Sequence, residues 1–531
     1  MERALAGRGE RFAIATPHSA ATQAGADAFD AGGNAIDAAL AAATTLAVVY
    51  PHMCGVGGDL FALVQHPEGE VLAVNSTGCS PASIDPDIVR AAHGEVMPAQ
   101  GPSTVTVPGA VAGWQALHAR GAALPWADAF ARAIALARDA DGVPVARSLA
   151  GSLSWEGGAN LAADPGLAAV FFPDGSPLAE GDRFVNAALT QTLSAIAERG
   201  PAALYGGEVG RRFALGLRVA GVPIEPSDLE GHEATLLSPL VGRYRDLDVR
   251  VTPPTSQGFV LLEILQALER LGLDPDPLGP DAGALALLFR AASLDRDRHL
   301  ADPDHMRVHP HSLLEDGHIA GLCEEVRSGR PVPVDVDPTA QGGTAGLAAA
   351  DADGWAVSLI QSLGPGFGAG ILEPDTGMVA QGRGSGFTLD PEHPNLLAPR
   401  KLPAHTLMPV MAHRAGRLAA VSGTMGGSAH PQITTMSLVR AFDLGMTPAA
   451  AVAAPRWLAG GMDPVGPDPF IVAEPAARAR VGAALEAAGF RLVALEELSE
   501  DAGHAHLITV APEGTFEAGT DPRADGEVAV R

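Results

Sequence analysis

The stretch RPVPVDVDPTAQGGT, residues 330–344, divides the chain into two unequal parts. Its prolines and alternating aspartates oppose helix formation, so we expect an extended and exposed segment. The segment ends in Gly342 and Gly343, and the residues from Thr344 onward predict the first strand of a hairpin. On composition alone, an ordinary linker between two domains explains the segment equally well.

The composition is that of a compact, turn-rich globular protein. Of 531 residues, 47% are hydrophobic and 18% charged, and the chain contains 63 glycines and 43 prolines. A net charge of −27 argues against nucleic acid as a partner. Lys401 is the only lysine, which excludes a P-loop or Schiff-base lysine elsewhere. The apolar run 35–50 carries Asp37 and is too short to cross a bilayer, so we expect no membrane association.

The cysteines and the N-terminal residues predict a compartment. Cys54, Cys79 and Cys323 lack metal-site spacing and cannot form a disulfide framework, which fits a reducing environment. Residues 1–18 lack the apolar core of a signal peptide. We therefore expect a cytoplasmic protein.

Hydrophobic periodicity predicts helices and strands that mix along the whole chain. Asn34 is a predicted N-cap, and Asp37 favours the N-terminus of the helix that follows. Helices are expected at 35–50, 186–199, 259–271, 284–294, 434–444 and 476–488. Strands are expected at 60–65, 71–75, 345–351, 355–360, 418–423 and 506–511.

Two segments resemble ligand sites but are better explained by structure. Residues 295–302, with His305, His309 and His311 beyond them, offer carboxylates and imidazoles. Acidic and basic residues alternate there as in an ion-paired turn, and no HExxH motif is present, so we expect no metal site. Residues 55–58 lack both GxGxxG spacing and a Walker lysine, which argues against a nucleotide.

The segment SGTMGGS, residues 422–428, follows a predicted strand and precedes a predicted helix. The backbone N–H groups of Gly426 and Gly427 could therefore converge on an anion. A simple strand-to-helix turn gives the same pattern.

Several motifs in one order resemble a known family. The N-terminal two thirds contain, in order, GGNAIDAA (32–39), YPHMCGVGGD (50–59), VPGAVAG (107–113), PPTSQG (253–258), and DRDR through DPD (295–304). These segments resemble the large-subunit motifs of the γ-glutamyltransferase family. Its small-subunit motifs resemble DADGWAVSLI (351–360), FGAG (367–370), Pro409 and GTMGG (423–427). The resemblance spans roughly residues 10–525.

This resemblance implies an N-terminal-nucleophile hydrolase with a four-layer αββα sandwich, which cuts its own chain before a threonine. Counting back from residues 351–354 places the cut between Gly343 and Thr344. A large segment, 1–343, would end in the precursor linker 330–343, and a small segment, 344–531, would begin with the nucleophile. The freed α-amine, with an ordinary pKa near ~7.7–8.0, would serve as the general base.

The same resemblance assigns further roles. Gly426 and Gly427 would form the oxyanion hole, and Ser362 would orient the nucleophile. His405 and Thr406 stand where the family has a serine pair that helps to bind the acyl group. For His405, a hydrogen-bonding role in the core remains an equal alternative.

Departures from the family pattern bear on specificity. Thr77 stands where the glutathione-cleaving members have an arginine, and Gly386 stands where they have an aspartate. A glutamyl head group should therefore be poorly held, and the chain is more similar to the acylase-like branch. Arg383 favours an acyl chain that bears a carboxylate, or else pairs with a structural acid.

We expect a cofactor-free, self-processed amidase or acyltransferase, with hydrolysis favoured over glutathione transpeptidation. Its partners would be a small amide or peptide-like substrate and the two fragments of its own chain, and a homo-oligomer remains open. Two alternatives remain: a related carbon–carbon bond hydrolase, and an unprocessed, non-catalytic homologue that binds a ligand.

Overall fold

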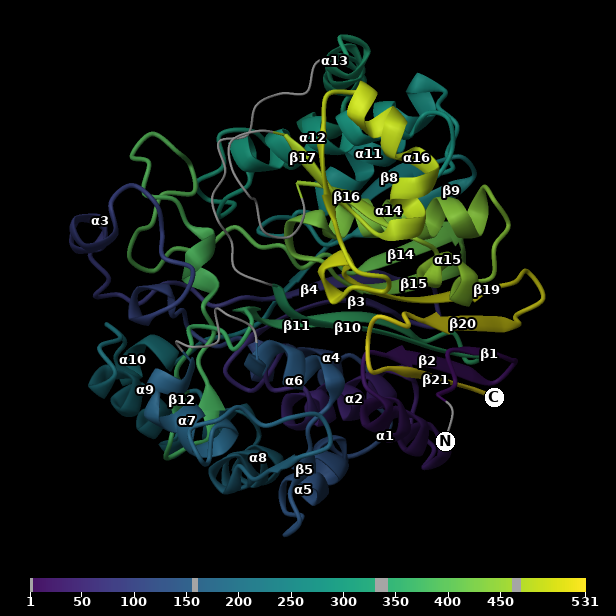
Figure 1. Cartoon of the computed structure of the whole chain (residues 1–531). Helices are drawn as coiled ribbons and strands as arrows, with labels where there is room; N and C mark the ends of the chain where they lie inside the picture. Colours follow the sequence, from purple (N-terminus) through teal and green to yellow (C-terminus); the bar gives the residue numbers. More distant parts are fainter. Residues whose placement is uncertain (1–2, 155–160, 330–341, 461–468) are drawn as a thin grey trace.

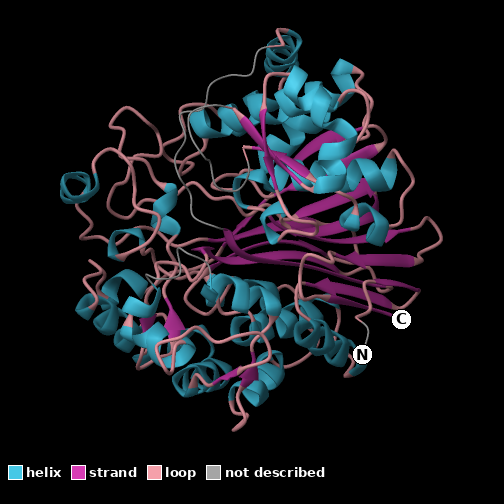
Figure 2. Ribbon diagram, in the orientation of Figure 1, coloured by secondary structure: helices cyan, strands magenta, loops and turns pink. Residues whose placement is uncertain are grey.

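The computed structural model describes residues 3–154, 161–329, 342–460 and 469–531. The predicted extended connector falls on residues 330–341, outside the described residues. At the centre, two layers of strands lie face to face between two layers of helices (Figures 1 and 2).

Within the described residues, most strands belong to two seven-stranded antiparallel sheets. The first sheet has the order β21 (Glu527–Val530), β2 (Phe12–Thr16), β10 (Gly342–Asp351), β11 (Ala356–Pro365), β3 (Asp59–Gln65), β4 (Val71–Ser76) and β7 (Thr235–Leu237). The second has the order β1 (Ala6–Gly9), β20 (Phe516–Thr520), β19 (His504–Val510), β15 (Arg417–Met425), β14 (Val410–Arg414), β9 (Leu247–Val251) and β8 (Leu240–Tyr244).

Small side chains let the two sheets approach closely. The core between them is rich in alanine, including Ala13, Ala15, Ala348 and Ala350. Where β10 crosses β15, a Cβ on Gly346 would lie 2.6 Å from the backbone N of Thr424. Only glycine fits at this crossing, which brings the beginning of β10 to the end of β15.

Helices cover both outer faces. The first sheet is covered by α1 (Ser19–Asp30), α2 (Ala35–Val49), α4 (Ala110–Ala119), α5 (Ala131–Ala137) and α8 (Ala187–Arg199). The second is covered by α11 (Gly258–Leu271), α12 (Ala282–His299), α14 (His430–Phe442) and α16 (Pro475–Ala487), and α13 (Asp316–Arg327) packs on α11 and α12. The four-layer αββα architecture is confirmed.

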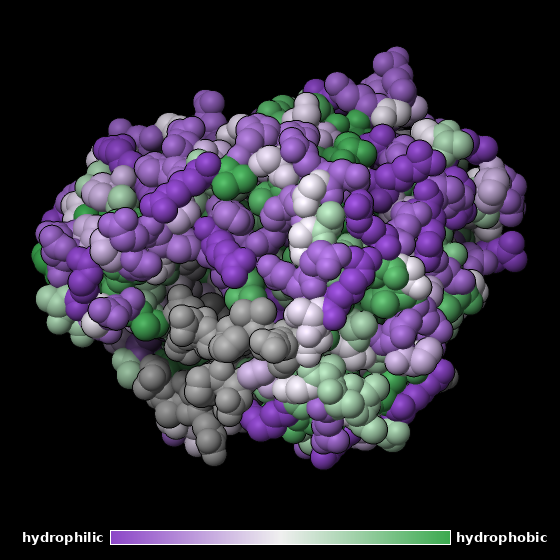
Figure 3. Space-filling model, turned by 90° about the horizontal axis from the view of Figure 1, so that it is seen from above, coloured by the Kyte–Doolittle hydropathy of each residue, from purple (hydrophilic) through white to green (hydrophobic). Residues whose placement is uncertain are grey.

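The outer surface of the second helix layer is mostly hydrophilic, with hydrophobic residues in small, separate patches (Figure 3). Among the described residues, no helix combines the length and apolar character needed to span a bilayer.

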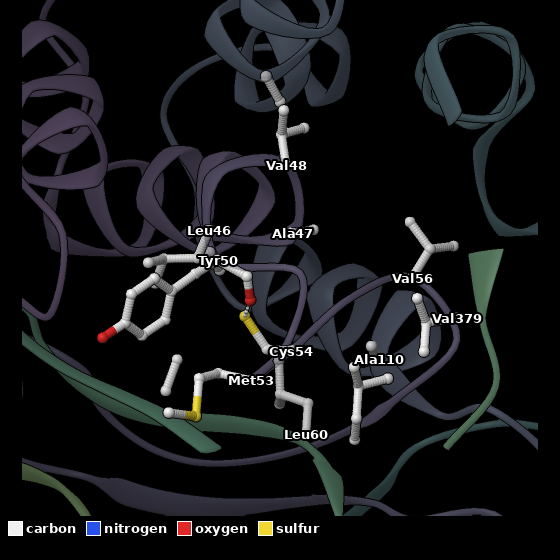
Figure 4. Packing of buried hydrophobic residues seen from close by; sticks show 14 of the residues in the cluster. Leu46, Ala47, Val48, Tyr50, Met53, Cys54, Val56, Leu60, Ala110 and Val379 are labelled. Carbon is white, nitrogen blue, oxygen red and sulfur yellow. Dashed lines mark hydrogen bonds between the residues drawn. The ribbon is translucent and has the colours of Figure 1, made fainter. Parts of the chain in front are cut away.

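The helix α2 shows how local sequence positions the centre of the molecule. Asn34 and Asp37 form the capping box that begins it, as predicted. Every residue of α2 is buried, so its alanines allow tight packing against the first sheet. At its end, the Tyr50 carbonyl accepts from the Met53 and Cys54 N–H groups at 3.0 and 3.2 Å, which turns the chain toward β3, and the Cys54 thiol also donates to it at 3.9 Å (Figure 4).

The predicted helices and strands are confirmed, with shifted ends. The helix α12 begins at Ala282 and continues to His299, beyond the predicted range 284–294, because its charged last turn extends the helix. The bond between Gly343 and Thr344 lies inside β10, and both sheets take strands from either side of it. The two predicted segments therefore build one fold together.

Candidate active site

Thr344 lies near the beginning of β10 and is 3% exposed. It is paired with Ser362 on β11, and the register of the two strands shifts between Gly343 and Thr344. The Thr344 hydroxyl donates to Ser362 Oγ at 3.1 Å. The predicted nucleophile and its predicted orienting residue are therefore in direct contact.

Ser362 connects the predicted nucleophile, Thr344, to the peptide bond that precedes it. Its hydroxyl donates to the Gly343 carbonyl at 2.6 Å and accepts from the Gly364 N–H at 2.9 Å. Arg383 Nη2 also donates to it at 2.6 Å. A cation behind a hydroxyl strengthens that hydroxyl as a donor, so this chain of contacts polarises the carbonyl between Gly343 and Thr344.

Arg383 is buried at this site, with 7% of the residue exposed. Its Nη1 lies 3.5 Å from Thr406 Oγ1, and its Nε has no hydrogen-bond partner among the described residues. Among the residues that the structure describes, no carboxylate lies within 4.0 Å of the Arg383 guanidinium. Burial lowers the pKa of Arg383 to about 10, which still leaves it charged at neutral pH.

Asp59, at the start of β3, is the central acidic residue, and it is 0% exposed. It is paired with Ser362 across β3 and β11. Its carboxylate accepts hydrogen bonds from Thr77 Oγ1 (2.8 Å), the Gly78 N–H (3.2 Å), Gln381 Nε2 (2.9 Å) and His405 Nε2 (3.2 Å). Four donors satisfy this charge without a direct bond from Arg383.

Two residues at predicted substrate-binding positions, Thr77 and His405, contact the Asp59 carboxylate. His405 is 1% exposed and its Nδ1 accepts from the Leu407 N–H, so its Nε2 donates to Asp59. Burial, with the Arg383 charge, lowers the pKa of His405 to about 4, so the ring is neutral. The structure thus supports the hydrogen-bonding alternative for His405, and Thr77 is engaged with the same carboxylate.

Sequence patterns did not single out Asp59, although one signal was present. Asp59 directly follows the pair Gly57–Gly58 and is the first residue of β3, whose residues are all buried. A Cβ on Gly58 would lie 2.4 Å from the Ser362 carbonyl oxygen, and one on Gly57 would lie 2.1 Å from that of Val379. These glycines serve close backbone packing beside the site.

Gln257, also missed, holds two predicted residues together. Its Nε2 donates to the Thr406 carbonyl at 2.7 Å and to the Gly427 carbonyl at 2.9 Å. Arg296 Nη1 donates to the next carbonyl, Ser428, at 2.9 Å. Gly427 has a φ of 51°, and this turn after β15 lies next to β10. The predicted oxyanion turn is therefore fixed from behind, through its carbonyl oxygens.

Metal-ligating side chains meet elsewhere. Asp295 gathers with Glu263 and His318 in the helix layer over the second sheet. Of the histidines that follow Asp295 in the sequence, His309 and His311 stack on each other instead.

A family model described as gamma-glutamyltranspeptidase matches residues 21–531. The chain belongs to the gamma-glutamyltranspeptidase family. A glutathione hydrolase-like proenzyme (YwrD) of Bacillus subtilis strain 168 is 35% identical over 525 residues, covering 98% of each chain. An oxamate amidohydrolase proenzyme of Klebsiella pneumoniae is 35% identical over 520 residues, covering 97% of each.

The crystal structure of a cephalosporin acylase from Bacillus halodurans has the same fold. It superposes with a TM-score of 0.89 at 30% identity, covering 100% of this chain and 98% of that one. The family includes acylases and glutathione hydrolases, made as proenzymes, and their shared chemistry is hydrolysis or acyl transfer.

Proposed function

We propose that this chain is a self-processing amidase that uses Thr344 as an N-terminal nucleophile, on short amides whose acyl group bears a carboxylate. The observation that carries the substrate class is Arg383, a buried cation one hydroxyl away from the nucleophile and without an ion-pair partner among the described residues.

Self-cleavage is the first step. The Thr344 hydroxyl attacks the Gly343 carbonyl carbon, the peptide C–N bond breaks, and an ester to Thr344 Oγ forms; water then cleaves the ester. The products are the Gly343 carboxylate and a free α-amine on Thr344. The hydrogen bond from Ser362 to the Gly343 carbonyl supports this step, because it stabilises the negative charge that develops on that oxygen. Cleavage would divide the chain into segments 1–343 and 344–531.

Substrate hydrolysis repeats the same chemistry. Thr344 Oγ attacks the amide carbonyl, its proton passes to the α-amine, and the leaving amine takes that proton as the C–N bond breaks. The N–H groups of Gly426 and Gly427 would bind the oxyanion. Water then hydrolyses the acyl ester and restores the hydroxyl.

The position of Arg383 suits a short acyl group. Arg383 Nη2 lies 2.6 Å from Ser362 Oγ, which is 3.1 Å from Thr344 Oγ1. Because the two groups are this close, a carboxylate only one or two bonds from the scissile carbonyl can reach the guanidinium while that carbonyl meets Thr344. Oxamate, the amide named for the Klebsiella relative, has this arrangement. A γ-glutamyl group carries its charges farther from the scissile bond.

Two measurements test the proposal. Wild-type protein should give two bands on a denaturing gel, with a new N-terminus at Thr344, and Thr344→Ala should remain a single uncut chain without amidase activity. Ammonia release should then be faster from oxamate than from its uncharged analogue oxamide or from glutamine. Intact wild-type protein would support the non-catalytic alternative, and a preference for oxamide would remove Arg383 from substrate binding.

A further inference from the structure

Three helices bring one ligating side chain each to a single point. Glu263 lies on α11, Asp295 on α12 and His318 on α13, and one ligand atom from each lies within 4.8 Å of the others. His318 Nε2 is 2.6 Å from Asp295 Oδ2 and 3.3 Å from Glu263 Oε1. The helices lie side by side at the top of Figure 1.

Glu263 is the unusual member. Its side chain is 0% exposed, and neither carboxylate oxygen accepts a hydrogen bond of normal geometry from the described residues. Among the described residues, His318 is the ion-pair partner of Glu263, and it is positive only when its ring is protonated. A buried carboxylate without hydrogen-bond donors is costly, so a cation bound at this point would stabilise it.

We propose that Glu263, Asp295 and His318 bind one divalent transition-metal ion, with Zn²⁺ as the ion of choice. Two carboxylates and a neutral imidazole balance the charge of such an ion, and mixed nitrogen and oxygen ligands suit it. Ligands at about 2.0–2.2 Å from zinc lie roughly 3.3 Å from one another in a tetrahedron. The contact between His318 and Glu263 already has this spacing, and Asp295 needs only to move outward slightly.

The cluster can be reached from solvent. The His318 side chain is 27% exposed, so an ion with a bound water can enter beside it. Asp295 Oδ1 faces Arg298 Nη1 at 3.6 Å, so its Oδ2 is left for the ion. Burial opposes protonation of the neighbouring His299 and lowers its pKa.

The ion would hold α13 to α11 and α12. Arg296, which follows the proposed ligand Asp295, donates to the Ser428 carbonyl of the predicted oxyanion turn. A metal at this position would therefore stiffen the last turn of α12, where Arg296 lies, and so the support of the predicted oxyanion turn. The site is independent of the proposed amidase, because none of its ligands touches Thr344 in the described contacts.

The competing explanation is an ion pair that shares protons. In the absence of an ion, burial raises the pKa of Glu263 to about 8, and Glu263 and Asp295 raise the pKa of His318 to about 9. Protons would then provide the missing positive charge.

Zinc binding distinguishes the two. Full-length protein, stripped with EDTA and dialysed, should bind about one Zn²⁺ per chain in isothermal titration calorimetry, and its melting temperature should rise as Zn²⁺ is added. Glu263→Gln and His318→Gln should each weaken binding by about 100-fold or more, since each removes a ligand. Both variants remove a buried charge or proton without changing the side-chain volume much, so we expect them to fold.

Asp297→Asn is the matched control, because Asp297 lies on the same helix with a half-exposed side chain that pairs with Arg296. It should bind Zn²⁺ like the wild type. Absence of binding, binding that survives Glu263→Gln, or binding lost equally in Asp297→Asn would overturn the proposal and leave the proton-sharing ion pair.

Discussion

Buried arginines in this molecule differ in whether a carboxylate compensates their charge. Arg523 donates to Glu474 at 2.5 Å and to Asp521 at 3.0 Å, and Arg456 donates to Asp521 at 2.5 Å. Arg383 is almost as deeply buried, yet it has no carboxylate within ion-pair distance among the described residues. Its hydrogen bonds go to hydroxyl groups.

The difference separates a structural charge from a charge available to a ligand. Burial opposes ionisation of all three arginines and lowers the pKa of Arg456 to about 10, but Arg456 and Arg523 lower the pKa of Asp521 to about 2, and Asp521 and Glu474 raise the pKa of Arg523. For Arg383, burial prevails over the more distant Asp59 and lowers the pKa. Arg456 and Arg523 are neutralised within the fold, whereas the carboxylate of the proposed substrate would neutralise Arg383.

The largest effect should come from breaking the compensated group. Asp521→Asn removes the carboxylate that both Arg456 and Arg523 contact and leaves buried cations with too little negative charge. We expect a loss of about 3–5 kcal/mol in the free energy of unfolding. Urea denaturation measures it, with variant and wild type compared in the same processing state.

Asp246→Asn serves as the control for that variant. Asp246 pairs with Arg414 at 2.7 Å, but its side chain is 61% exposed, so its loss should cost less than about 1 kcal/mol. Equal losses in the two variants would contradict the distinction between the buried groups.

Arg383→Gln should have the opposite profile, with little loss of stability and a large loss of activity. A charge-assisted hydrogen bond contributes about 1.5–3 kcal/mol, so kcat/KM for oxamate should fall by roughly 10- to 10²-fold. For oxamide, which lacks the carboxylate, it should change by only a few-fold. Arg8→Gln, at an arginine whose side chain is 68% exposed, should alter neither substrate. Equal losses on both substrates would mean that Arg383 supports the nucleophile and not the acyl group.

Much of this site could be predicted, because short motifs mark it. Gly426 and Gly427 lie in such a motif, whereas Thr344 was placed by counting back from residues 351–354 and Ser362 by the family resemblance. The structure places Thr344 and Ser362 in contact. Asp59 was missed because its partners, from Thr77 to His405, are far apart in the sequence and meet only across two strands and a loop.

The proposed metal site was missed for the same reason. The histidine-rich stretch after Asp295 contributes none of its histidines to the cluster, and the ligands come instead from three helices. Local spacing can indicate a site within one segment, but it carries no information about which helices pack together.

Self-cleavage should show a smaller effect of Arg383. Its hydrogen bond to Ser362 strengthens the donor that polarises the Gly343 carbonyl. Losing one such contact costs about 0.5–1.5 kcal/mol, so Arg383→Gln should slow cleavage by about 2- to 10-fold. The fraction of uncut chain against time after synthesis, on a denaturing gel, measures the rate. Cleavage at the wild-type rate would restrict Arg383 to substrate binding.

The smallest effect concerns pH. Burial lowers the pKa of Arg383 to about 10, so its charge is present below that pH and is lost as the pH rises through it. The ratio of kcat/KM for oxamate to that for oxamide should stay constant from pH 8.5 to 9 and fall by about half at pH 10. The α-amine, with an ordinary pKa near ~7.7–8.0, is already deprotonated in this range and affects both substrates alike. A compensated arginine such as Arg523, whose pKa is raised, would keep its charge throughout. A flat ratio up to pH 10.5 would contradict either the lowered pKa of Arg383 or its role in binding the substrate carboxylate.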